Sequence, residues 1–116
     1  LEADLHSSVA WANQNRSRWA FTLSNAGAYY FEDRADLAQL DAINWDAVQT
    51  NRWAGNGISR SIKEGKQAEF LMEQAFPWQL VTRIGVRSQQ VYGQVSGALQ
   101  TAGHKPHVEI KPDWYY

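Results

Sequence analysis

The chain has 116 residues, of which 44% are hydrophobic and 20% charged, and this composition is typical of a folded domain rather than a disordered tail. A formal net charge of -1 provides no overall positive field for nucleic acid or an anionic membrane, so any contact with DNA has to be local. The chain has no cysteine, which excludes disulfides, thiolate zinc sites and cysteine nucleophiles, and no apolar run approaches the roughly 18 residues that span a bilayer.

The first third of the chain predicts one helix and two short strands. Apolar residues recur at helical spacing through residues 1–15, which predicts an amphipathic helix. Trp19, Phe21 and Leu23 alternate with smaller or polar residues, as in a half-buried strand. Residues 29–31, Tyr-Tyr-Phe, follow the break at Gly27 and predict a second strand.

The middle of the chain predicts short helices and a loop. The apolar spacing between residues 33 and 53 favours short helices, with Asp41 or Asn44 available as an N-cap. Residues 54–60 are rich in turn-forming residues and predict a loop. Residues 66–72 fit a strand or a helix almost equally well, and periodicity does not decide between them.

The last third predicts a strand, a helix and a final strand. Residues 80–86 alternate after Pro77, as an edge or half-exposed strand would. The stripe from Val91 to Leu99 predicts an amphipathic helix that Gly103 can close. Val108 and Ile110 predict the last strand.

Together these elements predict an α+β fold with a small mixed or antiparallel sheet and flanking helices, forming a single domain over residues 1–116. Because no segment resembles a signal peptide or a membrane span, we expect a cytoplasmic protein that does not bind a membrane. The oligomeric state stays open.

The block from residue 61 to residue 86 carries the most specific motif. It reads SIKEGKQAEFLMEQAFPWQLVTRIGV, and its Gln-Ala-Glu-Phe-Leu core with the following Phe-Pro-Trp resembles the signature of the DarT family. Three further segments agree in order and spacing: FTLSNA at residues 21–26, ADLAQLDAINWDAVQTNRW at residues 35–53, and VEIKPDWYY at residues 108–116. The resemblance extends from about Trp19 to the C-terminus.

DarT proteins are toxins that use NAD to ADP-ribosylate a base in single-stranded DNA, so the resemblance implies the C-terminal half of an ADP-ribosyltransferase fold. The family usually has an acidic residue and a glycine after the Phe-Thr pair, where this chain has Leu23 and Ser24, and no role is assigned to these two. The family's NAD-holding segment, a Tyr-His-type strand and an arginine loop, has no counterpart before Trp19, and His6 does not replace it.

The resemblance places Glu69 at the family's catalytic glutamate. Cleavage of the bond between nicotinamide and ribose develops an oxocarbenium-like cation, which a carboxylate stabilises, as in glycoside hydrolysis. The same carboxylate can accept the proton that a DNA base loses as it attacks. The alternative is that Glu69 is one more exposed glutamate on an amphipathic segment.

Candidate DNA-binding residues lie in the stretch before Glu69, which forms the substrate-reading loop in this class of transferase. Basic and aromatic side chains together suit single-stranded DNA, whose bases stack on aromatic rings. The candidates are Trp45, Arg52, Trp53, Lys63 and Lys66. The lysines could equally belong to a solvated basic flank.

A metal site is not expected. His104 and His107 are three residues apart, but they flank Pro106 and have neither a third ligand nearby nor a cysteine to help. No residue is assigned to cofactor binding.

We therefore expect part of a DarT-like toxin, with NAD as co-substrate of the full-length family, single-stranded DNA as substrate and a macrodomain-type antitoxin as partner. One carboxylate cannot orient a dinucleotide, so NAD should bind weakly or not at all to these residues alone. The alternative is a truncated, non-catalytic module that binds single-stranded DNA or the antitoxin.

Overall fold

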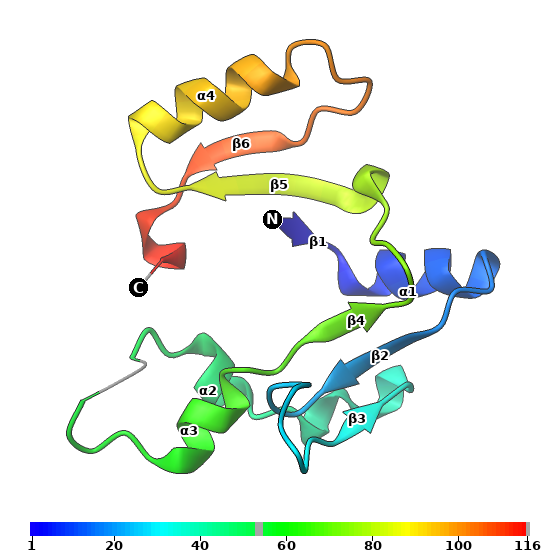
Figure 1. Ribbon diagram of the computed structural model, residues 1–116, viewed down its shortest axis with the longest axis vertical. Coiled ribbons are helices and arrows are strands. Elements are labelled where there is room, and N and C mark those ends of the chain that lie inside the picture. Colours follow the sequence, from blue (N-terminus) through cyan, green and yellow to red (C-terminus); the bar gives the residue numbers. More distant parts are fainter. Residues whose placement is uncertain (53–54, 116) are drawn as a thin grey trace. The chain divides into compact units, whose positions relative to one another are not determined.

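The computed structural model describes residues 1–52 and 55–115, so Trp53, Ala54 and Tyr116 lie outside the described residues. The chain divides into two compact units. Unit 1 comprises Leu1–Arg16 and Gln74–Tyr116, and unit 2 comprises Ser17–Glu73. Each unit contains a three-stranded sheet, so the predicted α+β class is confirmed, with two small sheets in place of the one expected (Figure 1).

The sheet of unit 1 is mixed and has the order β1-β5-β6. Strand β5 (Val81–Val86) pairs antiparallel with β1 (Glu2–Ala3) and parallel with β6 (His107–Ile110). The edge position predicted for residues 80–86 is therefore wrong. A strand at the centre of its sheet is shielded by neighbours on both sides, and Val81, Ile84, Gly85 and Val86 are all buried.

Two helices connect the strands of this sheet along the chain, one between β1 and β5 and one between β5 and β6, and both were predicted. Helix α1 (Leu5–Gln14) begins where the side chain of Asp4 accepts a hydrogen bond from the Ser7 backbone N–H. Helix α4 (Gln89–Leu99) is capped by Ser88 and ends before Gln100, earlier than the predicted stop at Gly103. Its half-buried Tyr92, Val95 and Leu99 pack against the buried core of β5.

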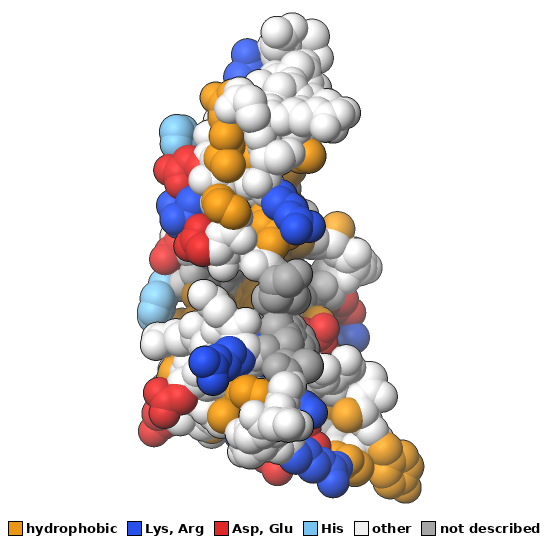
Figure 2. Space-filling view, turned by 90° about the vertical axis from the view of Figure 1, so that its left-hand side faces the viewer, with side chains coloured by type: hydrophobic (Ala, Val, Ile, Leu, Met, Phe, Trp, Pro, Cys, Tyr) orange, Lys and Arg blue, Asp and Glu red, His pale blue; other side chains and the backbone are white. Residues whose placement is uncertain are grey.

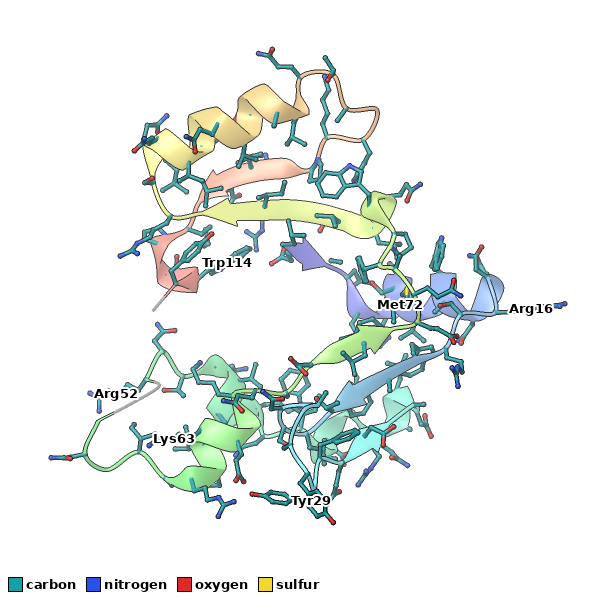
Figure 3. All side chains as sticks on the ribbon, viewed as in Figure 1. Arg16, Tyr29, Arg52, Lys63, Met72 and Trp114 are labelled. Carbon is teal, nitrogen blue, oxygen red and sulfur yellow. The ribbon has the colours of Figure 1, made fainter. Side chains whose placement is uncertain are left out.

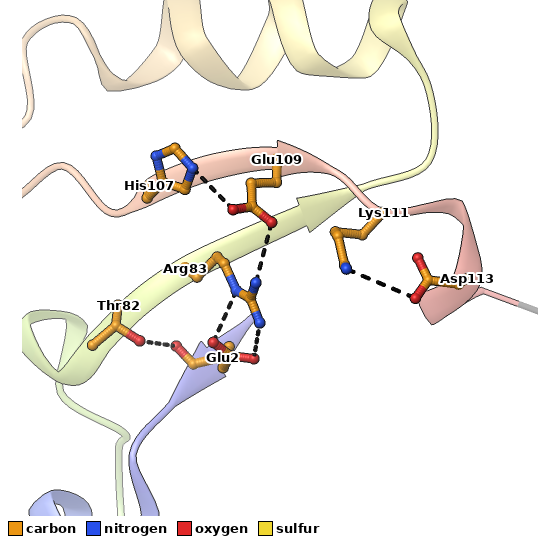
Figure 4. A network of polar contacts seen from close by, with 7 residues as sticks. All are labelled: Glu2, Thr82, Arg83, His107, Glu109, Lys111 and Asp113. Carbon is orange, nitrogen blue, oxygen red and sulfur yellow. Dashed lines mark hydrogen bonds and ion pairs between the residues drawn. The ribbon is translucent and has the colours of Figure 1, made fainter. Parts of the chain in front are cut away.

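A polar network ties the strands of unit 1 together (Figure 4). The Arg83 guanidinium, on β5, donates to both carboxylate oxygens of Glu2 at 2.9 and 2.6 Å and to Glu109 at 3.1 Å. Its carbon also lies 4.7 Å from the centre of the Trp114 ring. The 3₁₀ turn that carries Trp114 (Pro112–Trp114) is thus fixed to the sheet, and the Tyr115 hydroxyl donates to the Gly85 carbonyl at 2.8 Å.

The sheet of unit 2 is antiparallel and has the order β3-β2-β4. Strand β2 (Trp19–Thr22) was predicted, and it pairs with β3 (Asp33–Arg34) and β4 (Phe70–Met72). For residues 70–72 the strand alternative is therefore the correct one. The strand predicted at residues 29–31 is wrong, since those residues lie in the turn between β2 and β3 and are exposed.

Short helices follow β3. A 3₁₀ helix (Leu37–Ala42) is capped by Asp36, and α2 (Trp45–Gln49) is capped by Asn44, one of the two residues predicted for this role. Helix α3 (Arg60–Gly65) begins at the Ser59 cap and immediately precedes the Glu69 segment. A Cβ atom on Gly65 would lie 2.9 Å from that of Asn44, so the glycine permits the close approach of α3 to the start of α2.

Within residues 1–52 and 55–115, no helix is both long enough and apolar enough to cross a lipid bilayer.

Candidate active site around Glu69

The backbone of Glu69 is fixed by Thr22. Glu69 directly precedes β4, and Thr22 is the last residue of the neighbouring strand β2. The Thr22 backbone N–H donates to the Glu69 carbonyl at 2.8 Å, and the Glu69 N–H donates to the Thr22 hydroxyl oxygen at 2.9 Å. Because Thr22 is fully buried, this clamp is shielded from water, and it extends the β2–β4 pairing by one position.

The side chain of Glu69 is exposed but held at one oxygen. The Ala26 backbone N–H donates to Oε2 at 3.1 Å, while Oε1 has no hydrogen bond or ion pair recorded among the described residues. A hydrogen bond to a carboxylate is stronger than one between neutral groups. The arrangement therefore orients a negative charge and leaves one oxygen available for an incoming group.

The loop that carries Ala26 is closed by its own hydrogen bonds. At its base, the Leu23 N–H donates to the Glu32 carbonyl at 3.0 Å. Near its tip, Asn25 accepts from the Gly27 N–H through its side chain at 2.7 Å and from the Ala28 N–H through its carbonyl at 3.0 Å. These bonds define how the Ala26 N–H faces the carboxylate. The Thr22 hydroxyl donates to the Ser24 carbonyl at 2.6 Å, and this bond joins the loop to the Thr22 clamp.

Arg60 links this loop to α3. Its Nε donates to Glu64 at 2.6 Å, its Nη2 donates to the Tyr30 hydroxyl, and its guanidinium carbon lies 5.9 Å from the centre of the Tyr30 ring. The Glu64 hydrogen bond, followed by the charge of that carboxylate, raises the pKa of Arg60 above its ordinary value, so this cation stays charged. The sequence analysis missed Arg60, Thr22 and Ala26.

The signals that could have indicated these residues were weak. Thr22 stands at the end of an apolar strand within the FTLSNA segment, and Arg60 and Glu64 have the i, i+4 spacing of a helical ion pair. Ala26 acts through its backbone, so its side chain gives no signal. The contact between Arg60 and Tyr30 joins residues 30 positions apart and has no local pattern.

The described candidates for DNA binding all lie in unit 2, but their surroundings differ. Arg52 and Lys63 are exposed, Arg52 in the loop before α3 and Lys63 on α3 itself (Figure 3). Trp45 begins α2, is 43% exposed, and donates its indole N–H to the Leu40 carbonyl at 2.9 Å. Trp53 lies outside the described residues.

Lys66, like Trp45, has a hydrogen-bond partner within unit 2. It is the half-buried C-cap of α3, and its ammonium donates to the backbone carbonyl of Thr50. The side chain therefore attaches the end of α3 to the segment that follows α2. Any contact of Lys66 with a phosphate would have to share or replace this bond.

Basic side chains do not form one broad patch on the face that Figure 2 displays. Lys and Arg are interspersed there with acidic, hydrophobic and other side chains. This agrees with the net charge of -1 and with a local DNA contact.

The two C-terminal histidines make structural contacts. A ring nitrogen of His104 lies 2.7 Å from the Val81 carbonyl, and the His104 carbonyl accepts from the Trp78 indole. His107 lies 3.1 Å from Glu109. The described part of the chain has no group of three or more His, Cys, Asp or Glu side chains placed to hold a metal ion.

Two curated proteins similar to this chain are both named DNA ADP-ribosyl transferase. A protein of Thermus aquaticus named DNA ADP-ribosyl transferase is 35% identical over 114 residues, covering 97% of this chain and 49% of the relative. A protein of the same name from Thermus sp. strain 2.9 is 42% identical over 91 residues, covering 77% of this chain and 41% of the relative. The chain thus spans about half the length of the curated relatives it matches.

Solved structures of a DarT protein have a similar fold. Thermus sp. 2.9 DarT in complex with NAD+ matches with a TM-score of 0.80 and 31% identity, covering 92% of this chain and 54% of that one. The same protein in complex with ADP-ribosylated ssDNA matches with a TM-score of 0.84 and 29% identity, covering 98% of this chain and 52% of that one.

The family profile described as "ssDNA thymidine ADP-ribosyltransferase, DarT" matches residues 1–116. The match covers both units, including the Thr22, Ala26 and Glu69 arrangement. The chain belongs to the DarT family.

Proposed function

We propose that this chain provides the glutamate-bearing and DNA-reading part of a toxin that transfers ADP-ribose from NAD to a thymidine base in single-stranded DNA. The observation that carries the proposal is the position of Glu69, whose backbone is clamped by buried Thr22 and whose carboxylate is oriented by the Ala26 N–H. The named complexes of Thermus sp. 2.9 DarT with NAD+ and with ADP-ribosylated ssDNA support both substrates.

Glu69 would act on the sugar and on the base in one displacement. The bond between the ribose C1′ and the nicotinamide nitrogen breaks, and nicotinamide leaves with the electron pair. The positive charge that develops on the ribose is stabilised by the carboxylate. As that bond breaks, a nitrogen of the thymine base bonds to C1′ and loses its proton to the same carboxylate. The oxygen of Glu69 that Ala26 does not hold is suited to this second role.

The exposed side chains near α3 would contact the DNA strand. Arg52 and Lys63 are the proposed phosphate contacts, and Trp45, partly exposed at the start of α2, is a proposed stacking surface. Trp53 and Lys66 are also proposed to contact the DNA. For Lys66 this contact would share or replace its hydrogen bond to the Thr50 carbonyl. Such contacts neutralise phosphates and release counterions, so binding should weaken as salt is added.

Membership of the DarT family supports the partners proposed here. We expect NAD to act as a co-substrate that binds weakly or not at all to residues 1–116 alone, because Glu69 is the one residue here proposed to contact it. We also propose a macrodomain-type antitoxin as the protein partner and the cytoplasm as the location.

The proposal is tested in a chimaera in which this chain replaces the matching part of Thermus sp. 2.9 DarT. The chimaera is incubated with NAD and a single-stranded oligonucleotide that contains thymidine, and the mass of the oligonucleotide is measured by mass spectrometry. We expect the mass of one ADP-ribosyl group to be added, and none on a matched oligonucleotide without thymidine. A folded chimaera that modifies neither oligonucleotide contradicts the proposed activity.

A further inference from the structure

The loop that leads into α3 contains an asparagine followed directly by a glycine. Asn56 and Gly57 are the central residues of a turn in which the Ile58 N–H donates to the Gly55 carbonyl at 3.4 Å. Gly57 has a φ of 92°, a left-handed conformation that glycine adopts without steric cost. Both central residues are exposed, and the function proposed above assigns no role to either.

An asparagine followed by glycine can lose its side-chain amide without an enzyme. The backbone nitrogen of the glycine bonds to the asparagine Cγ and closes a succinimide ring. The amide NH₂ leaves as ammonia, together with the proton of the attacking N–H. Water then opens the ring. Cleavage between the nitrogen and Cγ gives aspartate, whereas cleavage between the nitrogen and the backbone carbonyl carbon gives isoaspartate, and both products carry a new negative charge.

The Gly57 nitrogen is free to attack. Its N–H donates to no group recorded among the described residues, and a Cβ atom at this position would have nothing within 4 Å. A side chain on the second residue obstructs ring closure, and glycine has none. The nitrogen can therefore lose its proton and approach Cγ of Asn56 without giving up a hydrogen bond or displacing a neighbour.

The Asn56 side chain is also unrestrained, unlike two other asparagines of unit 2. Oδ1 of Asn25 accepts from the Gly27 N–H at 2.7 Å, and Oδ1 of Asn44 accepts from the Ala47 N–H at 3.0 Å. These bonds fix each amide. No such bond to Asn56 is recorded in the part of the chain that the structure describes, and Asn56 is the only asparagine of the sequence followed by glycine. Asn56 is thus the asparagine best suited to this reaction.

The new charge would lie within the segment proposed to contact DNA. Arg52 precedes Asn56 in the same loop, and Lys63 follows it on α3. Figure 3 labels both basic residues at this end of unit 2. A carboxylate that replaces the neutral amide between two proposed phosphate contacts repels the DNA backbone.

Isoaspartate would have a second effect, on the backbone. Its main chain runs through the former side chain and is longer by one methylene group, so the bond between Ile58 and Gly55 cannot keep its geometry. Ser59 follows this turn directly and caps α3 by accepting from the Ile62 N–H at 3.3 Å. The isoaspartate product therefore disturbs the start of α3 as well.

We propose that Asn56 is a site of spontaneous deamidation, and that its conversion to aspartate or isoaspartate weakens the binding of single-stranded DNA. The site itself is argued from the turn of Asn56 and Gly57, whereas the effect on DNA rests on the proposed function. The reaction consumes water and releases ammonia. It gives the DNA-contacting loop a limited chemical lifetime.

Peptide mass spectrometry after incubation of the folded 116-residue chain tests the site. Cleavage after lysine and arginine releases residues 53–60, in which Asn56 is the sole asparagine. The other asparagines of unit 2 are in the peptides of residues 19–34 and 35–52. We expect residues 53–60 to gain the mass that replaces NH₂ by OH, in two products of equal mass, while the other two peptides stay unchanged. If the urea-unfolded chain converts and the folded chain does not, the turn protects Asn56 and the proposal is overturned.

Two variants of Asn56 link the modification to DNA binding, measured by fluorescence anisotropy with a single-stranded oligonucleotide. Asn56→Gln keeps the amide but would need a larger ring to lose it, so its mass and its affinity should not change during incubation. Asn56→Asp imitates one product and should bind about two- to fivefold more weakly at low salt, with a smaller difference at higher salt. Incubated wild type should lose affinity in step with the mass gain.

The two measurements distinguish failure of the site from failure of the proposed function. If Asn56 converts but Asn56→Asp binds DNA as tightly as wild type, the effect on DNA is overturned and the modification site stands. If fresh wild type does not bind single-stranded DNA, the proposed DNA contacts fail, and the mass of residues 53–60 still supports or overturns the site.

Discussion

The buried hydroxyl of Thr22 lies 2.9 Å from the backbone nitrogen of Glu69 and accepts its hydrogen bond. The same hydroxyl donates to the Ser24 carbonyl at 2.6 Å. The Thr22 side chain therefore links the backbone of Glu69 to the loop whose Ala26 N–H orients the Glu69 carboxylate. A threonine provides both the donor and the acceptor that this junction requires.

Thr22→Val keeps the shape of the side chain and removes both hydrogen bonds. Because Thr22 is fully buried, the Glu69 N–H and the Ser24 carbonyl lose a partner they cannot replace with water, and we expect a loss of about 1–3 kcal/mol in the free energy of unfolding. Urea unfolding measures it.

Thr22→Ser is the matched control, since it retains the hydroxyl and should cost about 1 kcal/mol for the lost methyl group. A second readout follows the loop: Glu69→Gln should shift the Ala26 amide signal in wild type and in Thr22→Ser, but less in Thr22→Val. Equal responses in all three backgrounds would show that Thr22 does not position the carboxylate.

Gly85→Ala should destabilise unit 1. A Cβ atom at Gly85 would lie 2.2 Å from Cε3 of the Trp114 ring, so the ring has to move, and overpacking of this kind costs about 1–3 kcal/mol. Gly93→Ala is the control, because it lies within α4 with nothing within 4 Å and should be neutral or stabilising. Thermal unfolding compares them, and equal melting temperatures would contradict the packing described.

The ion pair between Glu2 and Arg83 should contribute to stability in a pH-dependent way. The hydrogen bond from Arg83 lowers the pKa of Glu2 below its ordinary value of 4.5. Since the folded-state pKa is the lower one, the contribution is present above about pH 4.5 and is lost as the pH falls through the folded-state pKa. The difference in urea midpoint between wild type and Glu2→Gln should therefore shrink on acidification. A difference that is constant from pH 7 to pH 3 contradicts this.

Arg52 and Lys63 should each account for about one counterion released on binding single-stranded DNA. In plots of log affinity against log salt, Arg52→Gln and Lys63→Gln should each make the slope shallower by about 0.7. Arg87→Gln, an exposed arginine of unit 1 that is not assigned to DNA, provides the charge-matched control. If the control changes the slope as much as the two variants do, binding is non-specific attraction by any basic side chain.

Several elements of the fold could be predicted from the sequence because their signals are local. The helical stripe from Val91 to Leu99, the Asn44 cap and the alternation at Trp19 and Phe21 each depend on neighbours in sequence, and all were confirmed. Two of the wrong predictions concern long-range pairing. Residues 29–31 have strand-like side chains but lie in a turn closed between Leu23 and Glu32, and the strand at residues 81–86 is central because β1, about 80 residues earlier, pairs with it.

In the candidate site, too, the local signal could be predicted from the sequence and the long-range contacts could not. Glu69 could be proposed as the catalytic residue from its Gln-Ala-Glu-Phe-Leu motif, but the groups that hold it in the structure could not be predicted. The Thr22 hydroxyl lies 47 positions away in sequence and the Ala26 contact is made by a backbone N–H, which no side-chain pattern records.

The most direct measurement of the central claim is the modification rate of Glu69→Gln in the chimaera with Thermus sp. 2.9 DarT. Glutamine preserves size and can still accept from the Ala26 N–H, but it carries no charge to stabilise the ribosyl cation and accepts no proton. We expect the rate of ADP-ribosyl transfer to single-stranded DNA to fall at least about 10²-fold, with folding unchanged. Glu73→Gln, which alters an exposed carboxylate paired with Arg18, should retain activity. A Glu69→Gln protein as active as wild type would contradict the assignment of Glu69 as the catalytic residue.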